Sequence, residues 1–87
     1  SHLLLYQYWE TRRQYDGNHW RAEIRSFRNQ LNDDLTTNLL NFLTEKQELI
    51  YDRALGYVRE KTNLNIFPQE CPYLLEQLLD LNWYPEI

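Results

Sequence analysis

Few side chains of this sequence could carry out covalent or metal chemistry. Cys71 is the only cysteine, and it stands directly before Pro72, where we expect a short C-terminal helix to begin. A thiolate near a helix start can act as a nucleophile, but it needs a base within reach, and His2 and His19 are the only histidines. These residues also lack the spacing of a zinc site. We therefore interpret Cys71 as a small packed residue, and we expect no catalytic residue, no metal site and no cofactor.

Glu76 and Asp80 lie one turn apart on the same C-terminal helix and form a possible carboxylate pair. Acid–base or metal chemistry would need a second group of residues converging on them, and the sequence indicates none. No glycine-rich phosphate-binding loop is present either. A solvated helix face is the simpler interpretation of the pair, and we expect the chain not to be an enzyme.

Arg21, Arg25 and Arg28 are the one polar set whose spacing suggests binding. Steps of four and three residues place them on one face of a helix. The planar guanidinium group pairs well with carboxylates and phosphates, so the three are candidate contacts to a partner or an anion. Three interpretations remain open: a solvated or salt-bridged surface, a site for carboxylates, and a site for nucleic-acid phosphates.

Four helices are expected to position these residues, in one all-α domain that covers residues 1–87 as a small helical bundle. Their approximate spans are 1–15, 19–34, 37–62 and 72–80. Asp16-Gly17-Asn18 predicts the turn after the first helix, because these residue types favour turns. Thr36 or Thr37 is expected to cap the third helix, and Asn63 to end it.

The chain between the third and fourth helices reads as an extended connector that contains Phe67-Pro68 and Cys71-Pro72. Pro72 suits the first position of the last helix, where its missing N–H costs nothing. We expect the connector and the last helix to fold back over the second and third helices.

Apolar periodicity predicts which faces of the two long helices are buried. The second helix carries one stripe of large apolar residues. The stripe consists of Trp20, Ile24, Phe27 and Leu31. The third helix has an apolar arc much wider than the stripe of a surface helix, so we expect it to contact neighbours on two sides. The centre of this arc consists of Leu39, Leu43, Ile50, Ala54 and Tyr57, with Phe42 and Leu49 at one edge and Leu40 and Val58 at the other.

The first helix carries large side chains nearly all round its axis, which is the pattern of a helix buried on every side. We single out four of them as a candidate hydrophobic interface. They are Leu3, Leu5, Tyr6 and Trp9. Because this helix is the first element of the chain, we expect either another protein chain or a preceding segment of a longer domain to cover it.

Composition limits the remaining function classes. The net charge is −4, whereas a nucleic-acid-binding domain usually has a basic surface, so we do not expect nucleic acid as the main partner. No stretch is apolar for long enough to cross a membrane. A single thiol suits a reducing compartment, and we therefore expect a cytoplasmic protein that does not bind membranes.

Residues along the whole chain match the pattern of a known family. They are Trp20-Arg21, Ile24, Arg28, Tyr51, Ala54, Thr62, Leu64, Phe67-Pro68, Cys71-Pro72-Tyr73, Leu75-Glu76-Gln77 and Asp80. Through them the chain resembles a bacterial family of helical proteins catalogued as domain of unknown function 29. The resemblance implies an all-helical fold and no established activity. It also implies an acidic helical segment before the position of His2-Leu3-Leu4-Leu5, so that this chain corresponds to the C-terminal portion of the family's domain and an acidic segment is a candidate partner.

Three functions are compatible with these features. We expect a non-enzymatic helical module that docks another protein, or a second copy of itself, through the first helix and one side of the third, because contiguous exposed apolar patches mark interaction sites. The first alternative is a nucleic-acid accessory, antitoxin-like or associated with a mobile element, that uses the three arginines. The second alternative is a small enzyme completed by a segment that precedes Ser1.

Overall fold

The structure contains four helices and no strand, so the expected all-α fold is confirmed. It is a computed structural model that describes residues 1–87. The helices are α1 (His2–Tyr8), α2 (Glu10–Asp33), α3 (Thr37–Thr62) and α4 (Leu75–Leu79). None of them combines the length and the apolar character that are needed to cross a bilayer.

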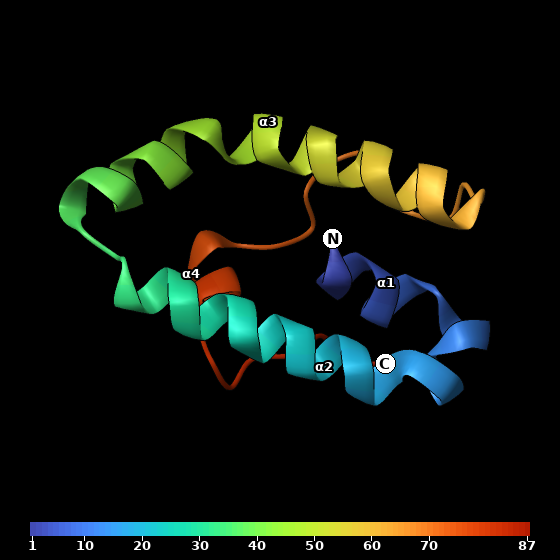
Figure 1. Ribbon diagram of the computed structural model, residues 1–87. Coiled ribbons are helices and arrows are strands. Elements are labelled where there is room, and N and C mark those ends of the chain that lie inside the picture. Colours follow the sequence, from blue (N-terminus) through green and yellow to red (C-terminus); the bar gives the residue numbers. More distant parts are fainter.

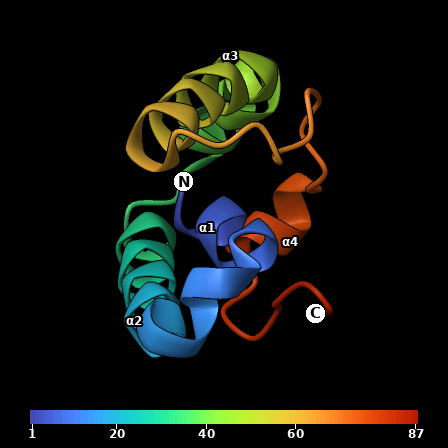
Figure 2. The same cartoon turned by 90° about the vertical axis from the view of Figure 1, so that its right-hand side faces the viewer.

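The two long helices, α2 and α3, determine the arrangement of the chain. They run in opposite directions and diverge from the short turn that joins them, and α1 lies in the wedge between them (Figure 1). After α3 the chain turns back, so that α4 contacts α2 and α3, while Tyr73 of the connector and Tyr84 of the C-terminal tail contact Gln7 and Tyr6 of α1 (Figure 2). α1 is therefore surrounded by the rest of the chain, as its apolar sequence requires.

The predicted boundary between the first two helices is wrong. The helical path is interrupted at Trp9, whose φ and ψ are −90° and 71°, and α2 continues through the expected turn at residues 16–18. Gly17 is buried inside α2, where a Cβ would lie 3.2 Å from Cγ of Arg13 and 3.9 Å from the ring of Tyr6. The glycine therefore leaves room for the side chain of Arg13, which reaches across to α1, and it does not form a turn.

The two ends of α3 agree with the prediction. Thr36 caps its start, because Oγ1 of Thr36 accepts a hydrogen bond from the N–H of Leu39 at 3.1 Å. Asn63 ends the helix in the left-handed conformation with φ 55°, and its N–H donates to the carbonyl of Arg59 at 2.8 Å.

The last helix is shorter than predicted, because α4 begins at Leu75 and Pro72 remains in the connector. The N–H of Leu74 donates to Oε1 of Gln77 at 2.9 Å, and this contact satisfies one of the free donors at the start of α4. The expectation that the tail folds back onto the long helices is correct, because α4 contacts both α2 and α3.

The hydrophobic core lies where α1, the C-terminal half of α3 and the connector meet. Its buried members are Leu4, Leu5, Trp20, Tyr51, Leu55, Val58, Phe67 and Tyr73. Complete burial of one such side chain stabilises a protein by about 1.5–3 kcal/mol. No residue of α3 before Tyr51 is buried, so the N-terminal half of that helix adds little to the core.

The predicted buried faces of the long helices are correct only in part. Trp20 and Ile24 are buried on α2, but Phe27 is 65% exposed and the next buried residue is Arg28. On α3 the buried side chains are those of Tyr51, Leu55 and Val58, whereas Ile50 and Tyr57, which were expected to face inward, are exposed. The apolar arc of α3 is wider than the surface that the core covers, so periodicity alone could not select the buried part.

Candidate functional site

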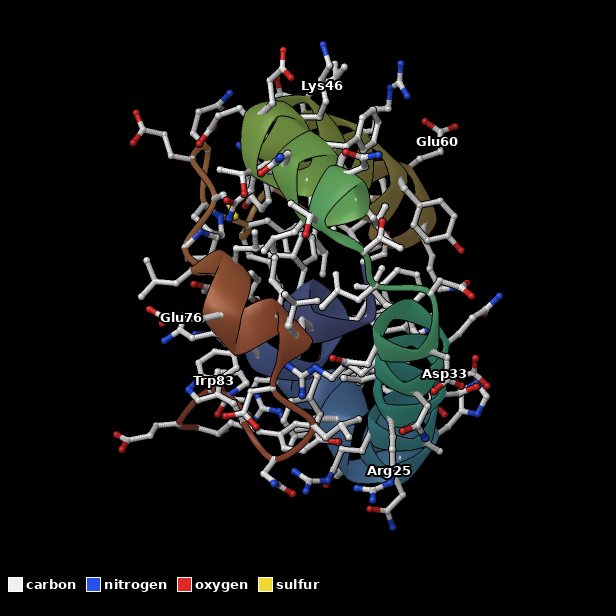
Figure 3. All side chains as sticks on the ribbon, turned by 90° about the vertical axis from the view of Figure 1, so that its left-hand side faces the viewer. Arg25, Asp33, Lys46, Glu60, Glu76 and Trp83 are labelled. Carbon is white, nitrogen blue, oxygen red and sulfur yellow. The ribbon has the colours of Figure 1, made fainter.

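One side of α3 carries several large exposed apolar residues together with two basic ones, the exposed Arg53 and the half-buried Lys46. We call this surface the outer face of α3; it consists of Phe42, Lys46, Leu49, Ile50, Arg53 and Tyr57. Steps of three, four and seven residues place all six on the same side of the helix. The four apolar side chains are 52%, 46%, 42% and 53% exposed in the order of the sequence. Figure 3 shows Lys46 on the side of α3 that points away from the other helices.

The opposite side of α3 determines this orientation. Leu55 and Val58 are buried in the core. The hydroxyl of Tyr51 donates a hydrogen bond to the carbonyl of Pro68, which attaches the connector to this side of the helix. The wide apolar arc of α3 is therefore divided between the core and the outer face.

Arg28 is only 1% exposed, although it belongs to the predicted arginine stripe. Its Nε and Nη2 donate to the carbonyls of Leu78 and Gln77, each at 2.9 Å, and its Nη1 donates to the carbonyl of Trp83 at 2.6 Å. Two of these carbonyls belong to the last turn of α4, where carbonyls have no partner within the helix. Burial lowers the pKa of Arg28, yet an ordinary arginine pKa is so high that the group stays charged.

The other two arginines of the stripe have different surroundings. The guanidinium carbon of Arg21 lies 3.7 Å from the ring centroid of Tyr84, and Nη1 of Arg21 donates to the hydroxyl of Tyr6 at 3.0 Å. Arg25 is exposed and points away from the helices (Figure 3). The three arginines therefore do not form one shared binding surface, because Arg28 faces inward and Arg21 is held by two tyrosines.

The four residues singled out on α1 lie mostly inside the chain. Leu5 is 1% exposed, and Leu3, Tyr6 and Trp9 are partly buried against the core. The ring of Trp9 also stacks on that of Trp20, with centroids 5.9 Å apart and an interplanar angle of 18°. The chain itself covers most of α1, so these residues do not form an exposed apolar surface.

The side chains considered for catalysis do not converge. Cys71 is partly buried, and its Sγ lies 3.8 Å from Nε2 of Gln47 and 3.6 Å from the carbonyl of Tyr73. Neither histidine is among its hydrogen-bond partners. The carboxylate of Asp80 accepts a hydrogen bond from the N–H of Asn82 at 2.9 Å. No group of three or more His, Cys, Asp or Glu residues is gathered so that it could hold a metal ion.

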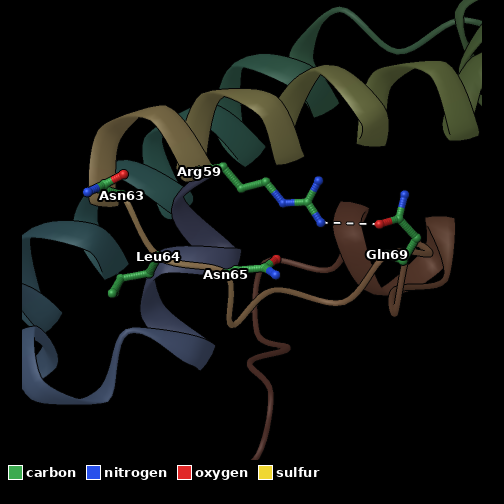
Figure 4. A pocket seen from close by; sticks show the side chains of 5 residues that line it. All are labelled: Arg59, Asn63, Leu64, Asn65 and Gln69. Atoms are coloured by element: carbon green, nitrogen blue, oxygen red, sulfur yellow. Dashed lines mark hydrogen bonds between the residues drawn. The ribbon is translucent and has the colours of Figure 1, made fainter.

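Two shallow depressions on the surface are lined mostly by polar residues, although two tryptophans also line the second. The first, of about 450 Å³, lies between the end of α3 and the connector, and Nη2 of Arg59 donates there to Oε1 of Gln69 at 3.2 Å (Figure 4). The second, of about 340 Å³, is lined by residues of α1, α2 and the end of α3, including both histidines. Burial lowers the pKa of His2. Neither depression contains Cys71, so neither brings a thiol and an imidazole together.

Comparison with known proteins assigns the chain to a family. Residues 1–84 match the family model described as Domain of unknown function DUF29. The chain belongs to the DUF29 family. No curated protein and no solved structure matches it.

In this DUF29 chain, several residues that carry the family resemblance hold the fold together. Tyr51, Phe67 and Tyr73 are buried in the core, and the hydroxyl of Tyr73 donates to Oε1 of Gln7 at 2.8 Å. Burial raises the pKa of Tyr73, and it raises the pKa of Tyr51 to about 12. Both hydroxyls therefore keep their protons at neutral pH and remain donors. These residues account for the fold of the DUF29 chain and leave its activity open.

Sequence reasoning included one side of α3 in the expected docking surface but did not identify Lys46 and Arg53 within it. The signal is present in the sequence, because both residues share the spacing of the exposed apolar side chains. This spacing can be assigned to an exposed face only when the burial of Tyr51, Leu55 and Val58 shows which side of the helix faces the core.

Proposed function

We propose that this DUF29 chain is a non-enzymatic helical module that binds another protein through the outer face of α3. The observation that supports the proposal is the exposure of Phe42, Leu49, Ile50 and Tyr57 along one side of a single helix. Large apolar side chains that are exposed together on one face commonly mark a site of protein interaction. The single thiol and the resemblance to a bacterial family support a cytoplasmic setting for this function.

The shape of the outer face is suited to a helix of the partner. Phe42 and Tyr57 lie fifteen residues apart, which corresponds to about 22 Å along a helix. A partner helix of four turns or more would cover this length and place its own apolar stripe along α3. Exposed aromatic residues stand at both ends of the face, and aromatic side chains often supply much of the binding energy at interfaces.

The geometry gives the two alternative functions less support. A phosphate-binding stripe needs several free guanidinium groups on one surface, but Arg28 is buried and Arg21 is engaged by Tyr6 and Tyr84. A thiol-dependent enzyme needs a base near Cys71, whose hydrogen-bond partners are Gln47 and the backbone. We therefore retain the docking module as the proposed function.

A designed peptide tests the proposal. The peptide is an amphipathic helix of about 20 residues, with leucines on one face and uncharged glutamine on the other, and binding is measured by fluorescence anisotropy. We expect the chain to bind it and the Phe42→Ser/Leu49→Ser variant to bind at least about tenfold more weakly, because burial of a large apolar side chain contributes about 1.5–3 kcal/mol.

The matched control is the Tyr15→Ser/Phe27→Ser variant, which removes two side chains of α2 that are 72% and 65% exposed. It should bind the peptide as the unchanged chain does. Circular dichroism verifies that both double variants keep their helices. Equal weakening by the two double variants, or no binding of the peptide to the unchanged chain at micromolar concentration, would contradict the proposed function.

A further inference from the structure

The centre of the outer face of α3 is positively charged. Lys46 and Arg53 lie seven residues apart, so they stack on the same side of the helix after two turns. Phe42 and Leu49 lie along one side of this pair, and Ile50 and Tyr57 lie along the other side, as the rotation of 100° per residue requires. The face is therefore two apolar ridges with a basic ridge between them.

Neither basic residue of this ridge is neutralised within the chain. The one ion pair of the structure joins Arg12 to Asp16 on α2. Lys46 and Arg53 have no carboxylate within ion-pairing distance, and Figure 3 shows Lys46 directed away from the rest of the molecule. Covering the outer face with a purely apolar surface would remove two unpaired cations from water, which is costly. The best-fitting partner therefore supplies negative charge between its apolar contacts.

A second copy of this chain does not meet that requirement. A two-fold contact brings the same surface patch of both copies together, and the basic ridge would then face itself. An antiparallel register that places Lys46 opposite Glu60 of the second copy also places Arg53 opposite Arg53. The register that pairs Arg53 with Glu60 places Lys46 opposite residue 67, beyond the end of α3, so it leaves the half of the outer face that holds Phe42 and Lys46 uncovered. Like charges that face each other across an interface oppose association. The charge pattern of α3 therefore selects a partner that differs from this chain.

We propose that the occupant of the outer face is an amphipathic helix of a different protein, with carboxylates two turns apart that face Lys46 and Arg53. Apolar residues on both sides of these carboxylates would pack on the two apolar ridges. This inference rests on the proposed docking function and names the chemistry of its partner. Lysine and arginine then determine which helix is bound, whereas the apolar ridges supply most of the attraction.

Three peptides with identical leucine positions test the inference. Each carries two central residues seven positions apart, either both glutamate, both glutamine or both lysine, and each is titrated against the full chain at low and at physiological salt. We expect the glutamate peptide to bind about three- to tenfold more tightly than the glutamine peptide, because exposed ion pairs add modest affinity. The lysine peptide should bind most weakly, and salt should reduce the difference between the peptides.

A charge reversal separates the effect of this ridge from the general charge of the chain. Arg53→Glu should remove the preference for glutamate, because the ridge then carries one charge of each sign. Arg25→Glu makes the same change of charge on an exposed residue of α2 and should keep the original preference. Sedimentation should show a monomer at tens of micromolar.

The outcomes distinguish this inference from the proposed function. If the glutamine peptide binds and Phe42→Ser/Leu49→Ser weakens it, but glutamate gives no gain, the docking surface is supported and the acidic occupant is wrong. The same conclusion follows if the chain forms a dimer that Leu49→Ser abolishes. If no peptide binds at all, both proposals fail.

Discussion

At the scale of single residues, Arg28 organises the end of the chain. It connects α2 to the carbonyls of Gln77, Leu78 and Trp83, and Nδ2 of the neighbouring Asn32 donates to a fourth carbonyl at 3.0 Å. Carbonyls at a helix C-terminus carry partial negative charge, so a buried guanidinium is a favourable partner for them. α4 has only five residues and would not be stable by itself. We infer that Arg28 keeps this short helix in place.

Removing the guanidinium of Arg28 should strongly destabilise the fold. Arg28→Met keeps a long apolar side chain but leaves three carbonyls without a charged donor, and such hydrogen bonds contribute about 1.5–3 kcal/mol each. We expect the free energy of unfolding to fall by about 2–4 kcal/mol. Urea denaturation followed by tryptophan fluorescence measures the change.

The control for this prediction is Arg25, which lies about one helical turn before Arg28 on α2. Arg25→Met alters an exposed residue of the same helix and should change the free energy of unfolding by less than about 0.5 kcal/mol. If the two variants lose similar amounts of unfolding free energy, Arg28 acts only as an ordinary helix residue of α2.

At the scale of elements, α2 supports both short helices with arginine side chains. Arg13 binds the end of α1 as Arg28 binds the end of α4, because its Nε and Nη2 donate to the carbonyls of Tyr6 and Gln7 at 2.6 and 2.8 Å. The last carbonyls of both short helices therefore find donors on one long neighbour. This arrangement explains how helices of seven and five residues persist in the fold.

The two glycines of the chain should respond in opposite ways to the same substitution. A Cβ at Gly56 on α3 would meet nothing within 4 Å, so Gly56→Ala should stabilise the helix by about 0.5–1 kcal/mol. A Cβ at Gly17 would press on Arg13, which is held by its two hydrogen bonds, so Gly17→Ala should destabilise the chain by about 1 kcal/mol. Thermal unfolding of both variants measures the two signs, and a stabilised Gly17→Ala would contradict the tight contact between position 17 and the side chain of Arg13.

At the scale of the whole molecule, stability is unevenly distributed along α3. Residues 37–50 include no buried side chain, whereas Tyr51, Leu55 and Val58 anchor the second half of the helix in the core. Segments with few buried contacts open locally at a lower free energy than the core does. We therefore expect the amides of residues 37–50 to exchange with deuterium faster than those of residues 51–62, as measured by mass spectrometry of peptic fragments. Equal protection of both segments from exchange would contradict the uneven distribution of stability along α3.

The same measurement connects stability with the proposed function. A helix that binds along the outer face would contact Phe42, Lys46 and Leu49 in the weakly held half of α3. Binding of the glutamate peptide should therefore slow exchange in residues 37–50 more than in α2. The outer face of α3, which stays exposed in this chain, should thus also gain the most protection from exchange when a partner binds.

Local signals in the sequence determined the features that depend on neighbouring residues. Thr36 and Asn63 mark the ends of α3 because capping and the left-handed stop act within one turn of the helix. Pro68 and Pro72 keep the connector extended for a similarly local reason. The all-α class and the extent of α3 follow from such signals.

Only the tertiary structure decided which way the side chains of these helices face. The break at Trp9 and the burial of Gly17 depend on α1 packing against α2, which no local turn signal reports. Arg28 has the spacing of a surface arginine, and its inward position depends on carbonyls about fifty residues away in the chain. Likewise, the apolar arc of α3 has a buried and an exposed part because the core is narrower than the arc. The sequence pattern alone allows several faces of a helix to be the buried one. Long-range contacts determine which face is buried.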